Sequence, residues 1–366
     1  MKVVAQTAAL QEALNLAGSI VAARSPKPVL QCVKLVAKGK ILTLLATDLE
    51  TSVRCQVTAV QIEQEGEALL PADRLNGIVR ESTDEETLTI ETEKEAVHVR
   101  GAGSHFKIYG YDPGEYPEVA DFTAEPDFQV DAGVLTVMIN RTLFATAKAH
   151  SHYAISGVQW EATGKKLQLV ATDGHRLAQA KGPLMGKAAA DVRAIVPGKL
   201  MSLIQRAAAD SEGGLDVKVG ENQVLIRTPR AVLVSALVQG TFPKYADVIP
   251  KDVAFTAAVN TSQFEHRVRQ AALLTNEESK GIRLTFKGQE LTLASRAPES
   301  GEAEVTCPIQ YDGDEVSIGF NPGFLVDALK VIDTEEIHLG MNASNKPAVL
   351  KAGNDFLYVL MPVDLS

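Results

Sequence analysis

Three short segments decide the fold of this chain: LPADRLNGIVRES at residues 70–82, VPGKLMSLIQRAA at 196–208 and NPGFLVDALKVID at 321–333. Each places a proline near the first position of a helical pattern, where the missing N–H of proline costs no hydrogen bond. Apolar residues then return at helical spacing, and the corresponding leucines, Leu75, Leu200 and Leu325, are separated by equal lengths of sequence. Repetition on this scale predicts three copies of one structural unit.

The rest of each copy follows the same order of elements. A second helical pattern precedes each proline segment, with apolar residues at Leu10, Ala13, Leu14 and Ala17, then at Leu143, Phe144 and Ala147, then at Phe264, Val268 and Ala271. Strand-like stretches repeat at 40–57, 166–182 and 290–307, and the closing stretches at 106–119, 232–248 and 356–366 look equivalent. These patterns predict an α+β fold of three repeated domains, at residues 1–127, 128–251 and 252–366, each with two helices and antiparallel sheets.

Composition limits the class of protein and its compartment. The 366 residues are 45% hydrophobic, enough for several cores, yet no run of about 18 apolar residues could cross a bilayer. The chain starts without the apolar region of a signal peptide, so we expect a cytoplasmic protein. Cys32, Cys55 and Cys307 form no CxxC pair and suggest neither a disulfide framework nor a zinc site.

The net charge of −10 argues by itself against a nucleic-acid partner, because phosphate binding normally goes with a basic surface. Formal charge does not describe distribution, however, and an acidic outside can surround a locally basic inside. The charge therefore leaves a nucleic-acid partner open.

The segment ATDGHRLA at residues 171–178 groups Asp173, His175 and Arg176 around a turn glycine, directly after an apolar strand. These side chains could be catalytic or could form the polar wall of a binding pocket. No nucleophile with an obvious base and no phosphate-binding glycine loop accompanies them, which favours the pocket. We expect Asp173 to fix the turn by accepting hydrogen bonds from backbone N–H groups. His150 and His152 lack further ligands, so we expect no metal site there.

Seven segments in order, ATDLE, YPEV, ATDGHRLA, FPKYADVIP, LLTNEESKGIRL, FNPGFLVDALK and YVLMPVDL, resemble the beta sliding clamps, the beta subunits of bacterial DNA polymerase III. The resemblance covers essentially the whole chain. It implies a ring made by a head-to-tail homodimer, with helices around a central hole, no catalytic activity and no cofactor. The implied partners are double-stranded DNA, held without sequence preference, and the replicative polymerase, clamp loader and repair polymerases.

The resemblance also implies which residues carry these functions. DNA contacts would come from Arg24, Arg74, Lys148, His152, Tyr153, Lys199, Arg206, Arg267 and Arg269. A pocket for short apolar peptides would use Ile155, Thr172, Gly174, His175, Arg176, Leu177, Pro243, Val248, Val359, Leu360, Met361, Pro362 and Val363. The subunit contact would join Phe106 and Ile108 to Leu273 and Leu274, flanked by ion pairs of Arg74 with Glu299, Glu302 or Glu304.

The chain departs from the family pattern at a few places around this pocket. Asp247 and Asp364 stand where relatives often carry cations, Ala154 stands where an aromatic residue is frequent, and Ser366 extends the terminus. These changes alter the rim and leave the apolar floor intact. They also keep an alternative open, a clamp-fold scaffold that binds peptides without encircling DNA.

Overall fold

The computed structural model describes residues 1–22, 24–94, 96–147, 153–209, 213–275, 281–297 and 301–365. It contains two compact units, Met1–Thr136 with Leu184–Ala190 and Lys199–Leu237, and Val137–Pro183 with Asp191–Gly198 and Val238–Ser366. No helix in the described ranges is long and apolar enough to span a membrane.

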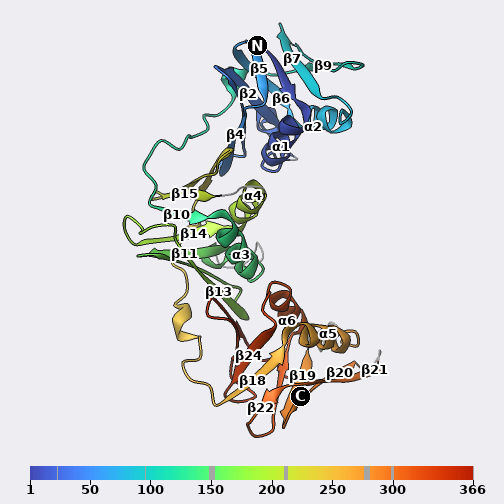
Figure 1. The fold of residues 1–366 in the computed structure, drawn as a ribbon, viewed down its shortest axis with the longest axis vertical. Coiled ribbons are helices and arrows are strands. Elements are labelled where there is room, and N and C mark those ends of the chain that lie inside the picture. Colours follow the sequence, from blue (N-terminus) through green and yellow to red (C-terminus); the bar gives the residue numbers. More distant parts are fainter. Residues whose placement is uncertain are drawn as a thin grey trace. The chain divides into compact units, whose positions relative to one another are not determined.

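Six α-helices occur among the described residues (Figure 1): α1 (Thr7–Gly18), α2 (Ala72–Glu81), α3 (Ala132–Leu143), α4 (Gly198–Ala208), α5 (Thr261–Ala272) and α6 (Pro322–Leu329). The three proline segments form α2, α4 and α6, as predicted. Pro322 occupies the start of α6, where Asn321 caps the helix by accepting a hydrogen bond from Gly323 N at 2.9 Å. Pro71 stands one position earlier, at the N-cap of α2.

The prediction for the other helix of the middle repeat was wrong. Helix α3 ends at Leu143, so Phe144 and Ala147 follow it rather than form its apolar face. Its buried apolar residues are Ala132, Leu135, Met138 and Ile139, at the spacing of one helix face. The apolar periodicity runs on past the helix end, and the sequence pattern was therefore assigned one to two turns too late.

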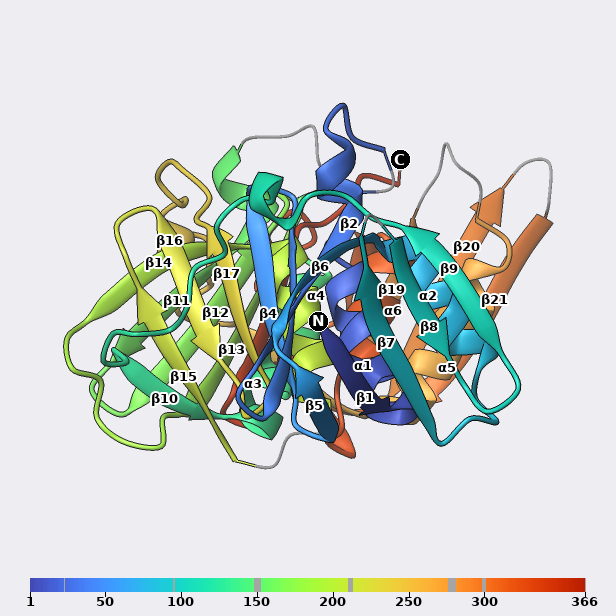
Figure 2. The same cartoon turned by 90° about the horizontal axis from the view of Figure 1, so that it is seen from above.

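The first unit holds two antiparallel sheets. One has the order β5-β1-β7-β8-β9 and the other β10-β15-β16-β17-β4-β3-β2-β6. Helix α1 packs against α2 (Figure 2), and also against β3 and β4. The strands are β1 (Lys2–Gln6), β2 (Cys32–Lys38), β3 (Ile41–Thr47), β4 (Thr51–Val57), β5 (Val60–Gln64), β6 (Gly66–Pro71), β7 (Thr87–Glu93), β8 (Ala96–Arg100), β9 (His105–Tyr109), β10 (Phe128–Asp131), β15 (Gly214–Val219), β16 (Gln223–Arg227) and β17 (Ala231–Ala236).

The second unit is built in the same way, with the sheets β14-β11-β12-β13-β26-β25-β24-β18-β22 and β21-β20-β19-β23. Helix α5 packs against α6 and lies on β20 and β21. The strands are β11 (Gly157–Thr163), β12 (Lys166–Thr172), β13 (Arg176–Pro183), β14 (Val192–Pro197), β18 (Phe255–Asn260), β19 (Ile282–Lys287), β20 (Glu290–Ala297), β21 (Gly301–Pro308), β22 (Gln310–Tyr311), β23 (Val316–Phe320), β24 (Glu336–Met341), β25 (Ala348–Ala352) and β26 (Phe356–Leu360).

Each unit contains a junction at which a sheet runs from one sequence repeat into the next. At the first junction β17 pairs with β4, and at the second β26 pairs with β13, both antiparallel. In both cases the closing strand of one repeat hydrogen-bonds to the second strand of a hairpin in the preceding repeat. Strand β9 is the closing strand of the first repeat, and β21 is the second strand of the corresponding hairpin in the third repeat. Each lies at the edge of its sheet.

Burial places the three cysteines in the interior as free thiols. Desolvation raises the pKa of Cys32 and Cys307 to about 11 and that of Cys55 to about 12. These thiols therefore stay protonated at neutral pH and behave as small apolar side chains.

Candidate functional site

The turn between β12 and β13 is held by its own side chains. Asp173 Oδ1 accepts hydrogen bonds from His175 N at 3.0 Å and Arg176 N at 3.1 Å, which confirms the role predicted for Asp173. Thr172 Oγ1 donates to Arg176 O at 2.7 Å. Gly174 has a φ of +91°, in the left-handed region that glycine adopts without strain. The turn is thus a rigid part of the site.

Arg176 fastens this turn to the third repeat. Its guanidinium pairs with Asp173 at 3.0 Å and Asp327 at 2.7 Å, and donates to Phe144 O at 2.8 Å. It also lies over the Phe324 ring, 4.3 Å from the centroid. The side chain is only 9% exposed, so Arg176 supports the site from beneath and is not a free cation at its rim.

The floor of the site is an apolar cluster in which predicted residues meet others that the sequence did not single out. Ile155, Leu177 and Val359, three of the residues expected in the pocket, belong to it and are almost fully buried. The additional members are Val170, Ile195, Phe242 and Val349, with Tyr245, Ile249 and Val253 packed against them. The apolar residues of FPKYADVIP were the available signal for Phe242, Tyr245 and Ile249.

Exposed apolar residues surround this floor. Val248 is 49% exposed and Met361 is 41% exposed, while Pro243 and His175 are exposed as well. Because free apolar side chains beside an apolar floor gain by association, this surface is suited to an apolar ligand. Met361 has a flexible side chain that adapts to ligands of different shape.

The C-terminal segment is positioned by backbone hydrogen bonds. Met361 N donates to His175 O at 2.9 Å, and Val363 N donates to Gly319 O at 2.9 Å. Pro362 and Val363 are half-buried along this path. Leu360, in contrast, is fully buried, and strand alternation turns its side chain away from that of Val359. We therefore place Leu360 in the core behind the site, which corrects its assignment to the pocket wall.

Tyr245 links the floor to the adjoining sheet. Its hydroxyl donates to Glu161 Oε2 at 2.9 Å and accepts from Gln168 Nε2 at 2.7 Å. Burial, and then the Glu161 carboxylate, raise the pKa of Tyr245 to about 12. The hydroxyl is therefore neutral at physiological pH and can both donate and accept a hydrogen bond.

Most of the cations expected to contact DNA are exposed, and several of them have a polar partner within the chain. Arg24, Arg74 and Arg206 are exposed, and Arg74 lies 3.7 Å from the exposed carboxylate of Asp73. Arg269 pairs with Glu265 one turn earlier on α5, and Arg267 donates to Gln270 at 2.8 Å. Lys148, His150 and His152 lie outside the described residues, and only the backbone of Tyr153, at the start of the short 3-10 helix Tyr153–Ser156, is described.

Lys199 has a partner that the sequence did not predict. At the start of α4 its ammonium binds Asp48 of the ATDLE turn. Burial acts to raise the pKa of Asp48, but hydrogen bonds from Lys199 and from Thr51 N outweigh it and hold that pKa below its ordinary value. Any phosphate that binds Lys199, as expected for a DNA contact, would have to compete with this carboxylate.

The expected subunit contact is exposed on each side. Phe106 is 38% exposed on the edge strand β9, whereas Ile108 is mostly buried, and both line a hollow of ≈ 810 Å³ beside α2. Leu273 is 79% exposed just after α5, and Leu274 is half-buried. Among the glutamates expected near Arg74, Glu302 pairs within its own chain with Arg296 at 3.1 Å, and Glu299 lies outside the described residues.

Family models match all three repeats. The N-terminal domain of the DNA polymerase III beta subunit matches residues 1–120, its central domain residues 129–244 and its C-terminal domain residues 246–364. A curated relative, the beta sliding clamp of Pseudomonas aeruginosa, is 31% identical over 98% of this chain and 99% of its own length. The beta sliding clamp of Escherichia coli K12 is 28% identical over 93% of this chain and 94% of its own length.

Solved structures agree with these relatives. A sliding clamp of Pseudomonas aeruginosa bound to griselimycin covers 100% of both chains at 30% identity, with a TM-score of 0.95. The DNA polymerase sliding clamp of Bacillus subtilis covers 100% of this chain and 99% of its own at 26% identity, with a TM-score of 0.94.

Proposed function

We propose, because this chain belongs to the DNA polymerase III beta-subunit family, that two copies of it close a ring around duplex DNA and keep the replicative polymerase on that DNA. The chain is an accessory subunit, and the chemistry belongs to the polymerase that it holds. We place the three domains at residues 1–127, 128–251 and 252–366, which the boundaries of the three family matches support. Its site of action is the bacterial cytoplasm.

The observation that best supports a ring is the pair of sheet edges at β9 and β21. The two junctions within the chain join a closing strand to a hairpin strand. Strands β9 and β21 are the same two kinds of strand, and each has one edge without a partner strand in the described part of the chain. An exposed strand edge is a ready site for pairing with another chain. In two copies arranged head to tail, β9 of each copy would pair with β21 of the other, and the two contacts would close a ring.

Charge and apolar surface at these edges support the same pairing. Strand β9 carries Lys107 between Phe106 and Ile108, and β21 carries Glu302 and Glu304, all of them outside the core apart from Ile108. Complementary charges favour association of β9 with β21 over association of either strand with itself. Leu273 would add an apolar contact next to the strands.

A ring holds DNA by topology, so the phosphate contacts inside it need only be weak. Strong contacts would hinder sliding, and the net charge of −10 limits nonspecific adhesion of nucleic acid to the protein. The exposed cations Arg24, Arg74, Arg206 and Arg269 suffice as a set of mobile contacts, with Lys199 weakened by Asp48.

The apolar site around Ile155, Leu177, Val359 and Met361 would take short apolar peptide segments of the partners. A shallow floor with an adaptable methionine fits several ligands, as a subunit shared by the polymerase, the clamp loader and repair polymerases requires. The rigid turn at Asp173 and the tethered C-terminal segment fix the two walls.

Retention on DNA of different topology tests this function. The protein is loaded onto nicked circular plasmid with a clamp loader, separated from free protein by gel filtration, and the plasmid is then cut once. We expect retention on the circle and rapid loss after cutting, because a ring slides off a free end. Equal retention before and after cutting would indicate ordinary binding. Peptide binding without any retention on circles would favour the scaffold that does not encircle DNA.

A further inference from the structure

The two linkers between repeats carry the same motif. Residues 116–122 read YPEVADF and residues 242–248 read FPKYADV. Position by position, Phe122 in the first linker corresponds to Val248 in the second. Val248 is one of the exposed apolar residues at the rim of the peptide site.

The two corresponding residues have opposite environments. Val248 is 49% exposed, whereas Phe122 is only 6% exposed. Phe122 packs on Val232 and Val234 of β17, with Leu225 alongside. The Phe122 side chain therefore covers an apolar sheet surface at the first junction, whereas the Val248 side chain at the second junction remains exposed.

The surface beneath Phe122 corresponds to the floor of the peptide site. Val234 lies opposite Ser52, the second residue of β4, and Val359 lies opposite Leu177, the second residue of β13. The two valines thus occupy the same place on equivalent strands. Val359 belongs to the floor of the open site, and Val234 belongs to the surface that Phe122 covers.

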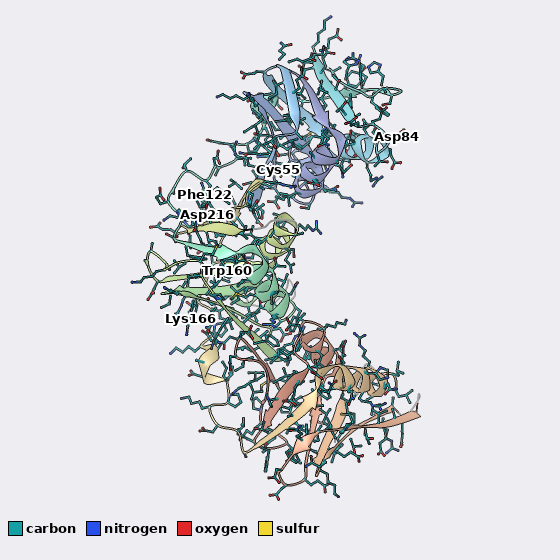
Figure 3. All side chains as sticks on the ribbon, in the orientation of Figure 1. Cys55, Asp84, Phe122, Trp160, Lys166 and Asp216 are labelled. Carbon is teal, nitrogen blue, oxygen red and sulfur yellow. The ribbon has the colours of Figure 1, made fainter. Side chains whose placement is uncertain are left out.

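Two arginines hold the first linker in this position. Arg227 lies over the Phe122 ring at 4.5 Å from its centroid, and is itself fixed by Asp216, with Nε donating to Oδ2 at 2.8 Å. Figure 3 labels Phe122 and Asp216, the two residues that Arg227 contacts. Arg54 of β4 donates to Val119 O at 3.0 Å and lies 3.7 Å from the carboxylate of Asp121. Cation–π and ionic contacts together bind the linker as they would bind a peptide.

We infer that the first junction is a second site for a short apolar peptide, occupied within the chain by the linker through Phe122. The inference rests on the proposed function of the open site, because it assigns the same class of ligand to the equivalent surface. A covalently attached segment has an effective concentration near the millimolar range, so a free peptide at micromolar concentration does not displace it. Each chain therefore offers its partners one open site.

The test uses a nine-residue peptide with the sequence of the linker itself, PEVADFTAE, residues 117–125. Calorimetric titration of the full-length protein gives the number of peptides bound per chain. We expect Phe122→Ala to bind one more equivalent than the parent, because the ring of the peptide replaces the missing ring. A control peptide with alanine in place of its phenylalanine should not fill this extra site.

Shortening the chain before Met361 separates the two sites. It should remove the equivalent bound at the second junction and leave the extra equivalent of Phe122→Ala in place. Identical binding by full and shortened chains would refute the open site, and identical stoichiometry in the parent and Phe122→Ala would refute the covered one. If Phe122→Ala does not fold, Phe122→Val gives the first linker the residue that stands at the corresponding position of the second linker, and should expose the same extra equivalent. Its absence there overturns the inference.

Discussion

Replacing Leu273 and Leu274 by alanine should weaken the ring without unfolding the protomer. Leu273 is 79% exposed, so within one chain it has little burial to lose. Fully burying a leucine contributes about 1.5–3 kcal/mol, and truncating this one should therefore cost about 1–2 kcal/mol at each subunit contact. A closed head-to-tail dimer has two such contacts, so the loss is about 2–4 kcal/mol and Kd rises about 30- to 1,000-fold.

Sedimentation velocity over a dilution series measures this change directly. The parent and the double variant are compared at equal concentrations, together with Leu49→Ala as a control. Leu49 is also an exposed leucine, at 59%, but it belongs to the turn between β3 and β4 and to neither edge strand. A dissociation constant for the double variant within threefold of the parent, or an equal shift in Leu49→Ala, would refute the assignment of this contact.

Three further outcomes follow from the site. Replacing Arg24 and Lys199 by glutamine should lower retention on circular DNA and reduce its salt slope by roughly 1 per lost phosphate contact, and an unchanged slope would place both outside the DNA path. Because Arg176 pairs with Asp173 and Asp327, it is not the partner of the exposed Asp247, so peptides with a basic flank beside Asp247 should bind better than peptides with an acidic flank by about 0.2–1 kcal/mol. Titrations at low and high salt check this, and equal affinities would contradict it. Arg176→Met should destabilise the protein by about 1–3 kcal/mol in urea unfolding, since it removes the hydrogen-bond donor of the half-buried Asp173 carboxylate and of the Phe144 carbonyl, and a loss under about 0.5 kcal/mol would disprove its anchoring role.

The repeated helices could be predicted because their signals are local. A proline followed by leucines at helical spacing, as in Pro322 and Leu325, is readable within a single turn or two of sequence. The end of α3 was misplaced for the opposite reason, since Phe144 and Ala147 continue the apolar periodicity and no glycine or proline marks where the helix stops. Helix ends without such punctuation depend on packing against the rest of the fold.

In the candidate site, too, features that depend on nearby residues could be predicted and features that depend on distant residues could not. The turn role of Asp173 was predictable because its bonding partners lie two and three residues away. The burial of Arg176 was not, because it depends on Asp327 and Phe324, which the fold brings from another repeat. The full burial of Leu360 follows from which face of β26 meets the core, and a sequence read alone leaves that face undetermined over so short a strand.

The matching strand edges have a consequence for how such a chain could have arisen. A single repeat carrying both a closing strand and a hairpin strand could join copies of itself without limit, forming open polymers as readily as closed rings. Linking three repeats in one chain consumes two of the joints internally, at β17 with β4 and at β26 with β13, and leaves one donor and one acceptor edge. Fusion thereby replaces joints whose formation depends on protein concentration with joints inside one chain. The two internal joints can then diverge in sequence, so that one is covered by its own linker while the other remains available to partner proteins.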